Sequence, residues 1–304
     1  MAEPLDWVRD GPGWPHHKHS HFICVGALRW HVQRFAPPAM QAAPLVLLIH
    51  GTGASAHSWR ALAPLLAVRC EVLAVDLPGH GFTRTPLAQA LSLPAMAAAL
   101  AALLAAGGDR PALVIGHSAG AAIGAQMCLD DRIAPVALVA LNGALLPLHG
   151  LAGRVFSPLA RLLAAQPLVP RAFAWRAARP AVLRRLLAAT GSRIDAEGQR
   201  LYGRLVADVG HAAGALRMMA AWDLQPLADA LPRLQPPLHL LAGARDRTVA
   251  PAQSREVQRR VPGATLQILP RVGHLAHEED AAAVWAALAP ALVALPGPRA
   301  VAPD

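Results

Sequence analysis

The sequence predicts an α/β fold: a mostly parallel, doubly wound sheet with an inserted helical cap. From residue 45 onward, apolar runs of strand length alternate with helical patterns. This alternation stops at about residue 145 and resumes near residue 238. The chain has 304 residues, of which 54% are hydrophobic. That is enough for one large α/β domain with an insertion.

The elements follow from the patterns in chain order. Phe22–Val25 and Leu28–Phe35 alternate around Gly26-Ala27 and predict an opening hairpin. The continuous apolar run Leu45–Ile49 predicts a strand buried on both faces. The other predicted strands are Val72–Val75, Ala112–Ile115, Val136–Leu141, Leu238–Ala242 and Thr265–Leu269. The predicted helices are Ser58–Val68, Leu93–Ala106, Ala119–Asp130, Pro251–Val261 and Glu278–Leu295.

The same patterns divide the chain into regions. Residues 1–20 are rich in Pro, Gly and His and predict an irregular N-terminal arm. Residues 21–144 and 225–295 form the predicted core, and residues 145–224, with amphipathic stretches broken by prolines, form the predicted cap. The Pro-rich tail, 296–304, is predicted to be disordered.

Composition limits the partners and the compartment. The net charge of +9 favours anionic partners, but no run of basic residues with interleaved aromatics predicts nucleic-acid binding. Three dispersed cysteines suit a reducing compartment. The acidic N-terminus does not resemble a signal peptide, and Leu91–Ala106 is shorter than the roughly 20 residues that span a bilayer. We expect a cytoplasmic protein, with peripheral membrane contact left open.

A candidate nucleophile follows the predicted strand at Ala112–Ile115. Ser118 lies in Gly116-His-Ser-Ala-Gly120, the G-x-S-x-G nucleophile elbow of α/β-hydrolases. The small residues allow the sharp turn between strand and helix that raises the serine hydroxyl above the sheet. The alternative is a serine that is merely a small residue in a glycine-rich turn.

A base and an acid stand in the chain order of this fold, Ser–Asp–His. His274 follows the last predicted strand and is the candidate base, with His277 as its nearby rival. Asp246 follows the preceding strand and is the candidate acid, because the competing position holds Asn142 and offers no carboxylate. Asp246 could instead cap a helix or pair with a neighbouring arginine.

The oxyanion hole has two candidate donors. They are the backbone N–H groups of Thr52, in His50-Gly-Thr-Gly-Ala-Ser55, and of Ala119, which follows the nucleophile. His50, Asp76 and His80 are interpreted as residues that shape loops by hydrogen bonding, outside the catalytic set.

We predict neither a cofactor nor a metal. Phosphate-loop, EF-hand and H-E-x-x-H patterns are absent from the sequence. The histidine run at residues 16–21 suggests a metal site, but terminal runs of this kind are usually solvated.

The cap combines arginines with apolar side chains, which suits a large apolar ligand carrying carboxylates or an anionic membrane surface. The alternative is ordinary amphipathic helices with arginine facing outward. His149 and His211 could ligate a metal inside such a ligand. The arginines are Arg154, Arg161, Arg171, Arg176, Arg179, Arg184, Arg185, Arg193, Arg200, Arg204 and Arg217.

Over nearly its whole length the chain resembles one α/β-hydrolase subfamily, the magnesium-chelatase accessory proteins of bacteriochlorophyll biosynthesis in phototrophic proteobacteria. The core motifs are general to the fold, whereas Leu141-Asn-Gly-Ala-Leu145 and the cap segments Gly214–Met219 and Trp222–Leu224 narrow the match. The histidine-rich arm departs from the family pattern.

The resemblance implies a role near Mg²⁺ insertion into protoporphyrin IX, with a porphyrin as substrate and chelatase subunits as partners. Two hypotheses follow. One is an ester-type hydrolase using Ser118, His274 and Asp246 with the Thr52 and Ala119 N–H groups. The other is a non-catalytic accessory or carrier protein whose cap binds porphyrin.

Overall fold

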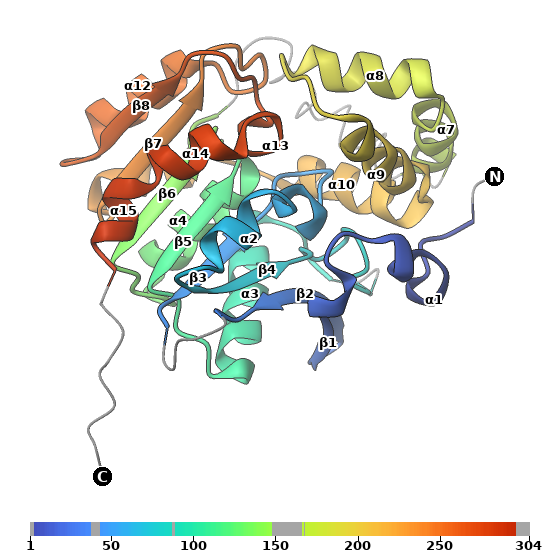
Figure 1. Cartoon of the computed structure of the whole chain (residues 1–304), viewed down its shortest axis with the longest axis horizontal. Coiled ribbons are helices and arrows are strands. Elements are labelled where there is room, and N and C mark those ends of the chain that lie inside the picture. The colour runs from blue at the N-terminus through green and yellow to red at the C-terminus, as the bar shows by residue number, and fades with distance from the viewer. Residues whose placement is uncertain (1–2, 38–42, 87–88, 148–165, 167, 296–304) are drawn as a thin grey trace.

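The core of the protein is one twisted sheet (Figure 1), seen in a computed structural model that describes residues 3–37, 43–86, 89–147, 166 and 168–295. The described residues form a sheet of eight strands in the order β1-β2-β4-β3-β5-β6-β7-β8. β1 pairs antiparallel with β2 and β2 with β4, and every later pairing is parallel. The strands are Ser20–Val25, Leu28–Phe35, Leu45–Ile49, Glu71–Val75, Leu113–His117, Ala137–Leu141, Leu238–Gly243 and Thr265–Leu269.

Helices cover both faces of the sheet, as the alternating sequence pattern predicts. On one face α3 (Leu93–Gly107), α4 (Ala119–Leu129), α11 (Gln225–Ala230) and α12 (Pro251–Arg260) bury apolar side chains against the strands. On the other face lie α2 (Leu62–Leu66), α13 (Ala276–Glu279), α14 (Ala281–Ala287) and α15 (Ala289–Val293). Three 3₁₀ turns of the core and arm are η1 (Gly11–Gly13), η2 (His17–His19) and η3 (Ala56–Trp59), and η4 (Leu231–Arg233) follows α11. The predicted α/β-hydrolase architecture is confirmed.

The last helical region differs from its prediction. Instead of one helix over Glu278–Leu295, the chain forms α13, α14 and α15. Asp280 has a non-helical backbone (φ −150°, ψ 78°), which ends α13, and its carboxylate accepts a hydrogen bond from the Ala283 N–H at the start of α14. Pro290 then stands in the first turn of α15, where a missing N–H costs nothing.

Helices α7 (Leu168–Ala177), α8 (Pro180–Ala189), α9 (Ala196–Ala207) and α10 (Val209–Ala221) lie between β6 and β7 in the chain, and we call them the cap helices. Figure 1 shows them gathered beside one edge of the core. The boundaries predicted for the cap, 145–224, stay a prediction, because residues 148–165 and 167 lie outside the described ranges. The predicted tail, 296–304, also lies outside them.

The N-terminal residues are more ordered than predicted. Residues 7–10 form helix α1, and residues 11–13 and 17–19 form 3₁₀ turns. Leu5 and Trp14 are buried against Phe82 of the core and against Leu201 and Leu205 of α9. The prediction of an irregular arm was wrong for these residues. Leu5 and Trp14 are too far apart in the sequence to form a periodic pattern, yet both fill a groove between core and cap.

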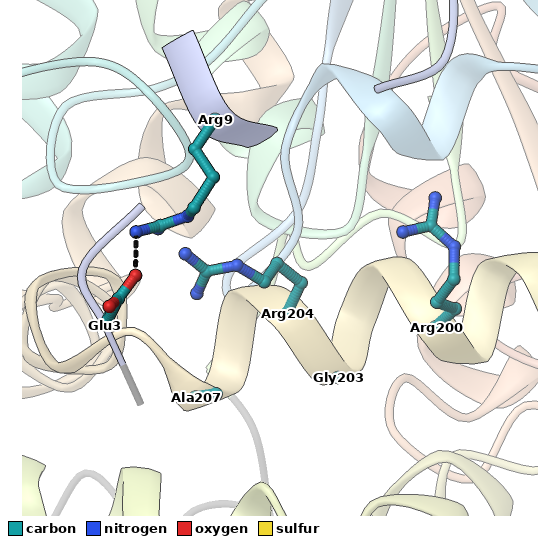
Figure 2. A pocket seen from close by; sticks show the side chains of 6 residues that line it. All are labelled: Glu3, Arg9, Arg200, Gly203, Arg204 and Ala207. Carbon is teal, nitrogen blue, oxygen red and sulfur yellow. Dashed lines mark hydrogen bonds and ion pairs between the residues drawn. The ribbon is translucent and has the colours of Figure 1, made fainter. Parts of the chain in front are cut away.

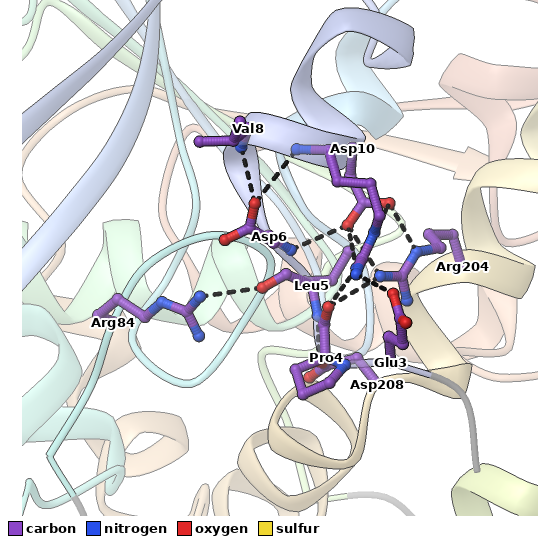
Figure 3. Close-up of polar contacts among 10 residues, drawn as sticks. Glu3, Pro4, Leu5, Asp6, Val8, Asp10, Arg84, Arg204 and Asp208 are labelled. Atoms are coloured by element: carbon purple, nitrogen blue, oxygen red, sulfur yellow. Dashed lines mark hydrogen bonds and ion pairs between the residues drawn. The ribbon is translucent and has the colours of Figure 1, made fainter.

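Polar contacts reinforce this N-terminal attachment (Figure 3). The Leu5 N–H donates to the Asp208 carboxylate at 2.6 Å, and the Leu5 carbonyl accepts from Arg84 at 2.9 Å. Arg204 of α9 pairs with Asp10 of α1 at 2.8 Å. The segment therefore connects a core loop to the start of α10 and to α9.

An open pocket of about 430 Å³ lies between this segment and α9 (Figure 2). Three of its lining residues are arginines, but each has an acidic partner: Arg9 pairs with Glu3, Arg200 with Glu197 and Arg204 with Asp10. Since the guanidinium charges are balanced, we interpret this pocket as part of the attachment rather than as an anion site.

Helix α10 contacts the core through backbone. At Gly214, an added Cβ would lie 1.8 Å from the Gly79 carbonyl oxygen, so only glycine permits this approach. One turn earlier, the His211 ring accepts from the Gly81 N–H at 3.0 Å and donates to the Gly53 carbonyl at 3.1 Å. Two core loops and α10 are thereby joined.

Candidate active site

Ser118 occupies a strained turn between β5 and α4. Its φ of 52° and ψ of −116° lie in a region that side-chain-bearing residues rarely adopt. The flanking glycines leave no space for substitution: a Cβ at Gly116 would lie 2.4 Å from the Ala121 nitrogen, and one at Gly120 would lie 2.1 Å from the Ile49 oxygen. The predicted elbow geometry is therefore present, and its strain is held by close backbone packing.

His274 and Asp246 meet across two loops at the carboxyl edge of the sheet. The His274 Nδ1–H donates to Asp246 Oδ2 at 2.8 Å, and both residues are about 6% exposed. Asp246 Oδ1 accepts from the N–H groups of Thr248 at 2.7 Å and Val249 at 2.9 Å. The carboxylate is thus fixed by its own loop while its second oxygen orients the imidazole. This contact favours the acid over the alternatives of a cap or an arginine partner.

Asn142 positions the His274 loop, a role that the sequence did not indicate. Its Nδ2 donates to the carbonyls of Gly273 at 2.7 Å and His274 at 3.0 Å, and its Oδ1 accepts from the Gly243 N–H at 3.0 Å. Asn142 is fully buried with a φ of 48°, a conformation that asparagine tolerates better than most residues. Asn142, at the strand end that offers no carboxylate, therefore connects the ends of β6 and β7 to the loop after β8.

His117 adds a second contact to the same loop. Its Nε2–H donates to the His274 carbonyl at 2.8 Å. Burial lowers the pKa of His117 well below its usual value, so the ring stays neutral and its protonated nitrogen is fixed by this bond.

A cavity of about 400 Å³ lies above the elbow. Four of the predicted site residues line it: Ser118, His274, Thr52 and Ala119. The rest of its lining is largely apolar, and most of it comes from the cap helices, with further residues from core loops. The apolar residues from the cap helices are Phe173, Leu183, Leu186, Leu187, Val206, Ala212, Ala215, Leu216 and Met219, and Trp222 follows directly after α10. The structure therefore gathers the predicted nucleophile, base and oxyanion donors around one largely apolar cavity.

The two predicted oxyanion donors belong to different elements. Ala119 is the first residue of α4, where an N–H has no acceptor within the helix. Thr52 lies in the loop after β3, which His50 anchors by donating to the Gly51 carbonyl and accepting from the Leu77 N–H at 2.9 Å. Burial lowers the pKa of His50 to about 3, so this neutral arrangement holds at neutral pH.

Asp76 shapes the neighbouring loops, as its position predicts. It accepts from the N–H groups of Ala56 at 2.7 Å and Phe82 at 2.8 Å, and from His31 Nδ1 at 2.8 Å. Burial opposes its ionisation, but the electrostatic interaction and hydrogen bond with His31 outweigh burial and lower the pKa of Asp76 to about 2. The cluster is fully buried.

The rival histidines have other surroundings. His277 lies in the first turn of α13, buried with its ring centroid 4.4 Å from that of Trp59, and it is not among the cavity-lining residues. His211 lines the cavity, but both of its nitrogens are occupied by Gly53 and Gly81, so it is not available to ligate a metal. His149 lies outside the described ranges.

No metal site is formed in the part of the chain that the structure describes, where no group of three or more His, Cys, Asp or Glu side chains is arranged to hold an ion. In the histidine-rich arm, one ring nitrogen each of His16 and His19 instead contacts the backbone carbonyls of Arg60 and Arg34.

None of the described cap arginines lines the cavity, and Arg154 and Arg161 are outside the described ranges. The described lining of the cavity therefore does not support the expectation that cap arginines bind the carboxylates of a ligand. Among the described helices, none has the length and apolarity to cross a membrane.

Comparisons with known proteins agree with this architecture. A family model described as the alpha/beta hydrolase fold matches residues 44–281. The magnesium-chelatase 30 kDa subunit of Rhodobacter capsulatus is 42% identical over 87% of this chain and 91% of its own. An alpha/beta hydrolase fold protein from Burkholderia ambifaria superposes with a TM-score of 0.71 at 24% identity, covering 89% of this chain and 99% of that one. A thermophilic esterase from Thermogutta terrifontis gives 0.69 at 21% identity, covering 90% and 98%.

Proposed function

The chain belongs to the alpha/beta hydrolase fold family and, within it, to the family of the magnesium-chelatase 30 kDa subunit, and we propose that it is a serine hydrolase of the carboxylic-ester type. The observation that carries this proposal is the combination of a strained Ser118 with the His274–Asp246 pair in one apolar cavity. Strain of this kind persists only where the surroundings enforce it, and it is common at catalytic sites.

In the proposed reaction the Ser118 hydroxyl attacks the ester carbonyl while His274 Nε2 takes its proton. The N–H groups of Thr52 and Ala119 hold the oxyanion of the tetrahedral intermediate. The C–O bond then breaks, and His274 returns the proton to the departing alcohol. Water, deprotonated by His274, releases the acid product and restores Ser118. Asp246 keeps the His274 Nδ1–H pointed at itself throughout and stabilises the imidazolium.

The cavity favours an apolar acyl or alcohol group near Ser118, because its described walls carry few polar atoms and no arginine or lysine. A carboxylate on the same substrate would remain outside, at the mouth. Similarity to a magnesium-chelatase subunit further supports a role in bacteriochlorophyll biosynthesis near magnesium insertion, with chelatase subunits as partners and a porphyrin as candidate ligand.

The first test is covalent labelling. A fluorophosphonate probe with a long alkyl chain should label the purified protein once, and Ser118→Ala should abolish the label. Asp246→Asn keeps the shape of the loop but loses the charge that orients His274, so the labelling rate should fall by about 10³-fold or more. Ser58→Ala, at a buried serine outside the cavity, is the matched control and should label normally. Labelling that persists in Ser118→Ala would contradict the proposed nucleophile.

The second test distinguishes catalysis from a carrier role. Ser118→Ala is introduced into a phototrophic host that lacks its own copy, and bacteriochlorophyll is measured. Catalysis predicts that pigment is lost although the variant is folded and present at normal abundance. Full pigment with Ser118→Ala would instead support a non-catalytic, porphyrin-binding accessory protein.

A further inference from the structure

Two of the cap helices, α7 and α8, expose large apolar side chains to solvent. Leu168 is 69% exposed and Trp175 is 61% exposed, and Phe173 and Leu186 are also exposed. Other exposed large apolar residues in the described chain, such as Val8, Val68 and Val293, are scattered over separate elements. Single exposed apolar residues need no explanation, but a concentration that includes a tryptophan indicates a binding surface.

The same helices have an unbalanced charge. Residues 168–190 contain no Asp or Glu, whereas they contain five arginines: Arg171, Arg176, Arg179, Arg184 and Arg185. All five are exposed, and none forms an ion pair with another described residue. This differs from the arginines of α9, where Arg200 and Arg204 each have an acidic partner.

The apolar and basic side chains are interleaved. Leu168, Arg171 and Trp175 follow the spacing i, i+3, i+7 on α7, so they share one side of the helix. The guanidinium of Arg179 lies 4.1 Å from the Trp175 ring centroid. We call the exposed side chains of these two helices the α7–α8 face. In a protein core these arginines would be paired with acidic side chains, whereas the interface of an anionic bilayer accommodates basic and apolar side chains together.

The α7–α8 face adjoins the cavity. Leu186 lines the cavity and is also 42% exposed, and Phe173 has the same two environments. Helix α8 thus presents Leu183 and Leu187 to the cavity and Arg184 and Arg185 to solvent. A substrate that entered where Leu186 and Phe173 meet solvent would pass over apolar side chains on its way to Ser118.

We propose that the α7–α8 face docks onto the surface of a bilayer containing anionic lipid. Trp175 and Leu168 enter the headgroup region, and the arginines lie against the phosphates. The cavity then opens toward the membrane, so an apolar substrate reaches Ser118 from the bilayer without crossing water. The docking is independent of the proposed hydrolysis. Only the route of the substrate to Ser118 rests on that proposed function.

Vesicle sedimentation tests the docking. The full chain is incubated with phosphatidylcholine vesicles containing 0% or 30% phosphatidylglycerol, and the bound fraction is measured at low and high salt. We expect binding that requires the anionic lipid and weakens as salt screens the charges. Ser118→Ala should bind as well as the unaltered protein, so this assay stands even where the hydrolase proposal fails.

Two variants probe the face itself. Arg184→Gln with Arg185→Gln should weaken partitioning about thirtyfold, since one arginine near an anionic surface contributes roughly fivefold. Trp175→Ala removes an apolar anchor that is outside the cavity lining and should weaken it roughly tenfold. Arg255→Gln with Arg259→Gln removes the same charge from α12 and is the matched control, expected to bind nearly as the unaltered protein does.

The proposal is overturned by vesicle binding that is absent, or that falls equally in the α12 control and in the α7–α8 variants. It is also overturned by specific binding of purified chelatase subunits that requires Trp175 while anionic vesicles do not bind, because the face would then be a protein interface. Thermal unfolding of each variant verifies that a loss of binding does not come from a loss of fold.

Discussion

Replacing Asn142 by aspartate tests how the His274 loop is held. The two side chains have nearly the same shape, but aspartate places an oxygen where Nδ2 now donates to the carbonyls of Gly273 and His274. Loss of the bond to the Gly273 carbonyl costs roughly 2 kcal/mol, and loss at the His274 carbonyl, which keeps its bond from His117, costs roughly 1 kcal/mol. Repulsion between the new carboxylate and these carbonyls adds to this total in a fully buried site.

The charge makes the effect depend on pH. A carboxyl group that faces two carbonyls is protonated more easily in the folded protein than in the unfolded chain, so its folded pKa is raised. The penalty is therefore absent below the unfolded pKa and grows as pH rises toward the folded pKa, by about 1.4 kcal/mol per pH unit. We expect Asn142→Asp to lose about 1.5 kcal/mol of unfolding free energy at pH 5, about one pH unit above the unfolded pKa, and about 4 kcal/mol at pH 8, where the carboxyl is ionised.

Urea unfolding followed by far-UV circular dichroism at the two pH values measures this difference. Gln258→Glu, the same amide-to-carboxylate change at an exposed position, is the control and should stay within about 0.5 kcal/mol of the unaltered protein. A loss for Asn142→Asp below about 1 kcal/mol at pH 8, or an equal loss at both pH values, would refute the structural role given to Asn142.

Three further changes address other features. Gly120→Ala should prevent accumulation of folded protein, because its Cβ would lie 2.1 Å from the Ile49 oxygen. Gly13→Ala is the control and should fold normally, since there is open space around Gly13. Soluble yield and circular dichroism of the two variants measure the difference. Leu5→Ala should lower the unfolding free energy by about 3 kcal/mol through the cavity left between arm and cap, and unchanged urea unfolding would contradict that contact. Burial lowers the pKa of His211 to about 4, so the unfolding free energy should fall by roughly 3 kcal/mol as pH drops from 6.5 to 4. His211→Gln should flatten this dependence of unfolding free energy on pH. An unaltered dependence would show that other groups cause it.

The sequence predicted the fold class well because its signal is local and repeated. Each core strand, such as Leu45–Ile49, is a short apolar run followed by a helical pattern, and parallel strands with helical crossovers are the arrangement that buries both. The elbow at Ser118 could be predicted for the same reason, since its glycines are neighbours in the chain. Asp246 and His274 could be placed because the order of strands sets which loops share an edge.

The contacts that the sequence did not indicate are those between distant segments. The importance of Asn142 depends on carbonyl groups 131 and 132 residues away, whose direction no local pattern encodes. Leu5 and Trp14 are buried only because α9 and Phe82 leave a groove for them. The interrupted helix near Asp280 depends on one non-helical residue that caps α14, a signal that the apolar periodicity of Glu278–Leu295 obscures.

The Gly79–Gly214 contact limits how the active site can open. Helix α10 lies on the core with no side chain between the two backbones, and a hinge motion of the whole cap would have to separate them and break both hydrogen bonds of His211. Opening is therefore expected to be a displacement of α7 and α8 alone over a stationary α10. In hydrogen exchange, the α10 amides should resemble those of the core, while the α7 and α8 amides exchange early and report when the site is accessible.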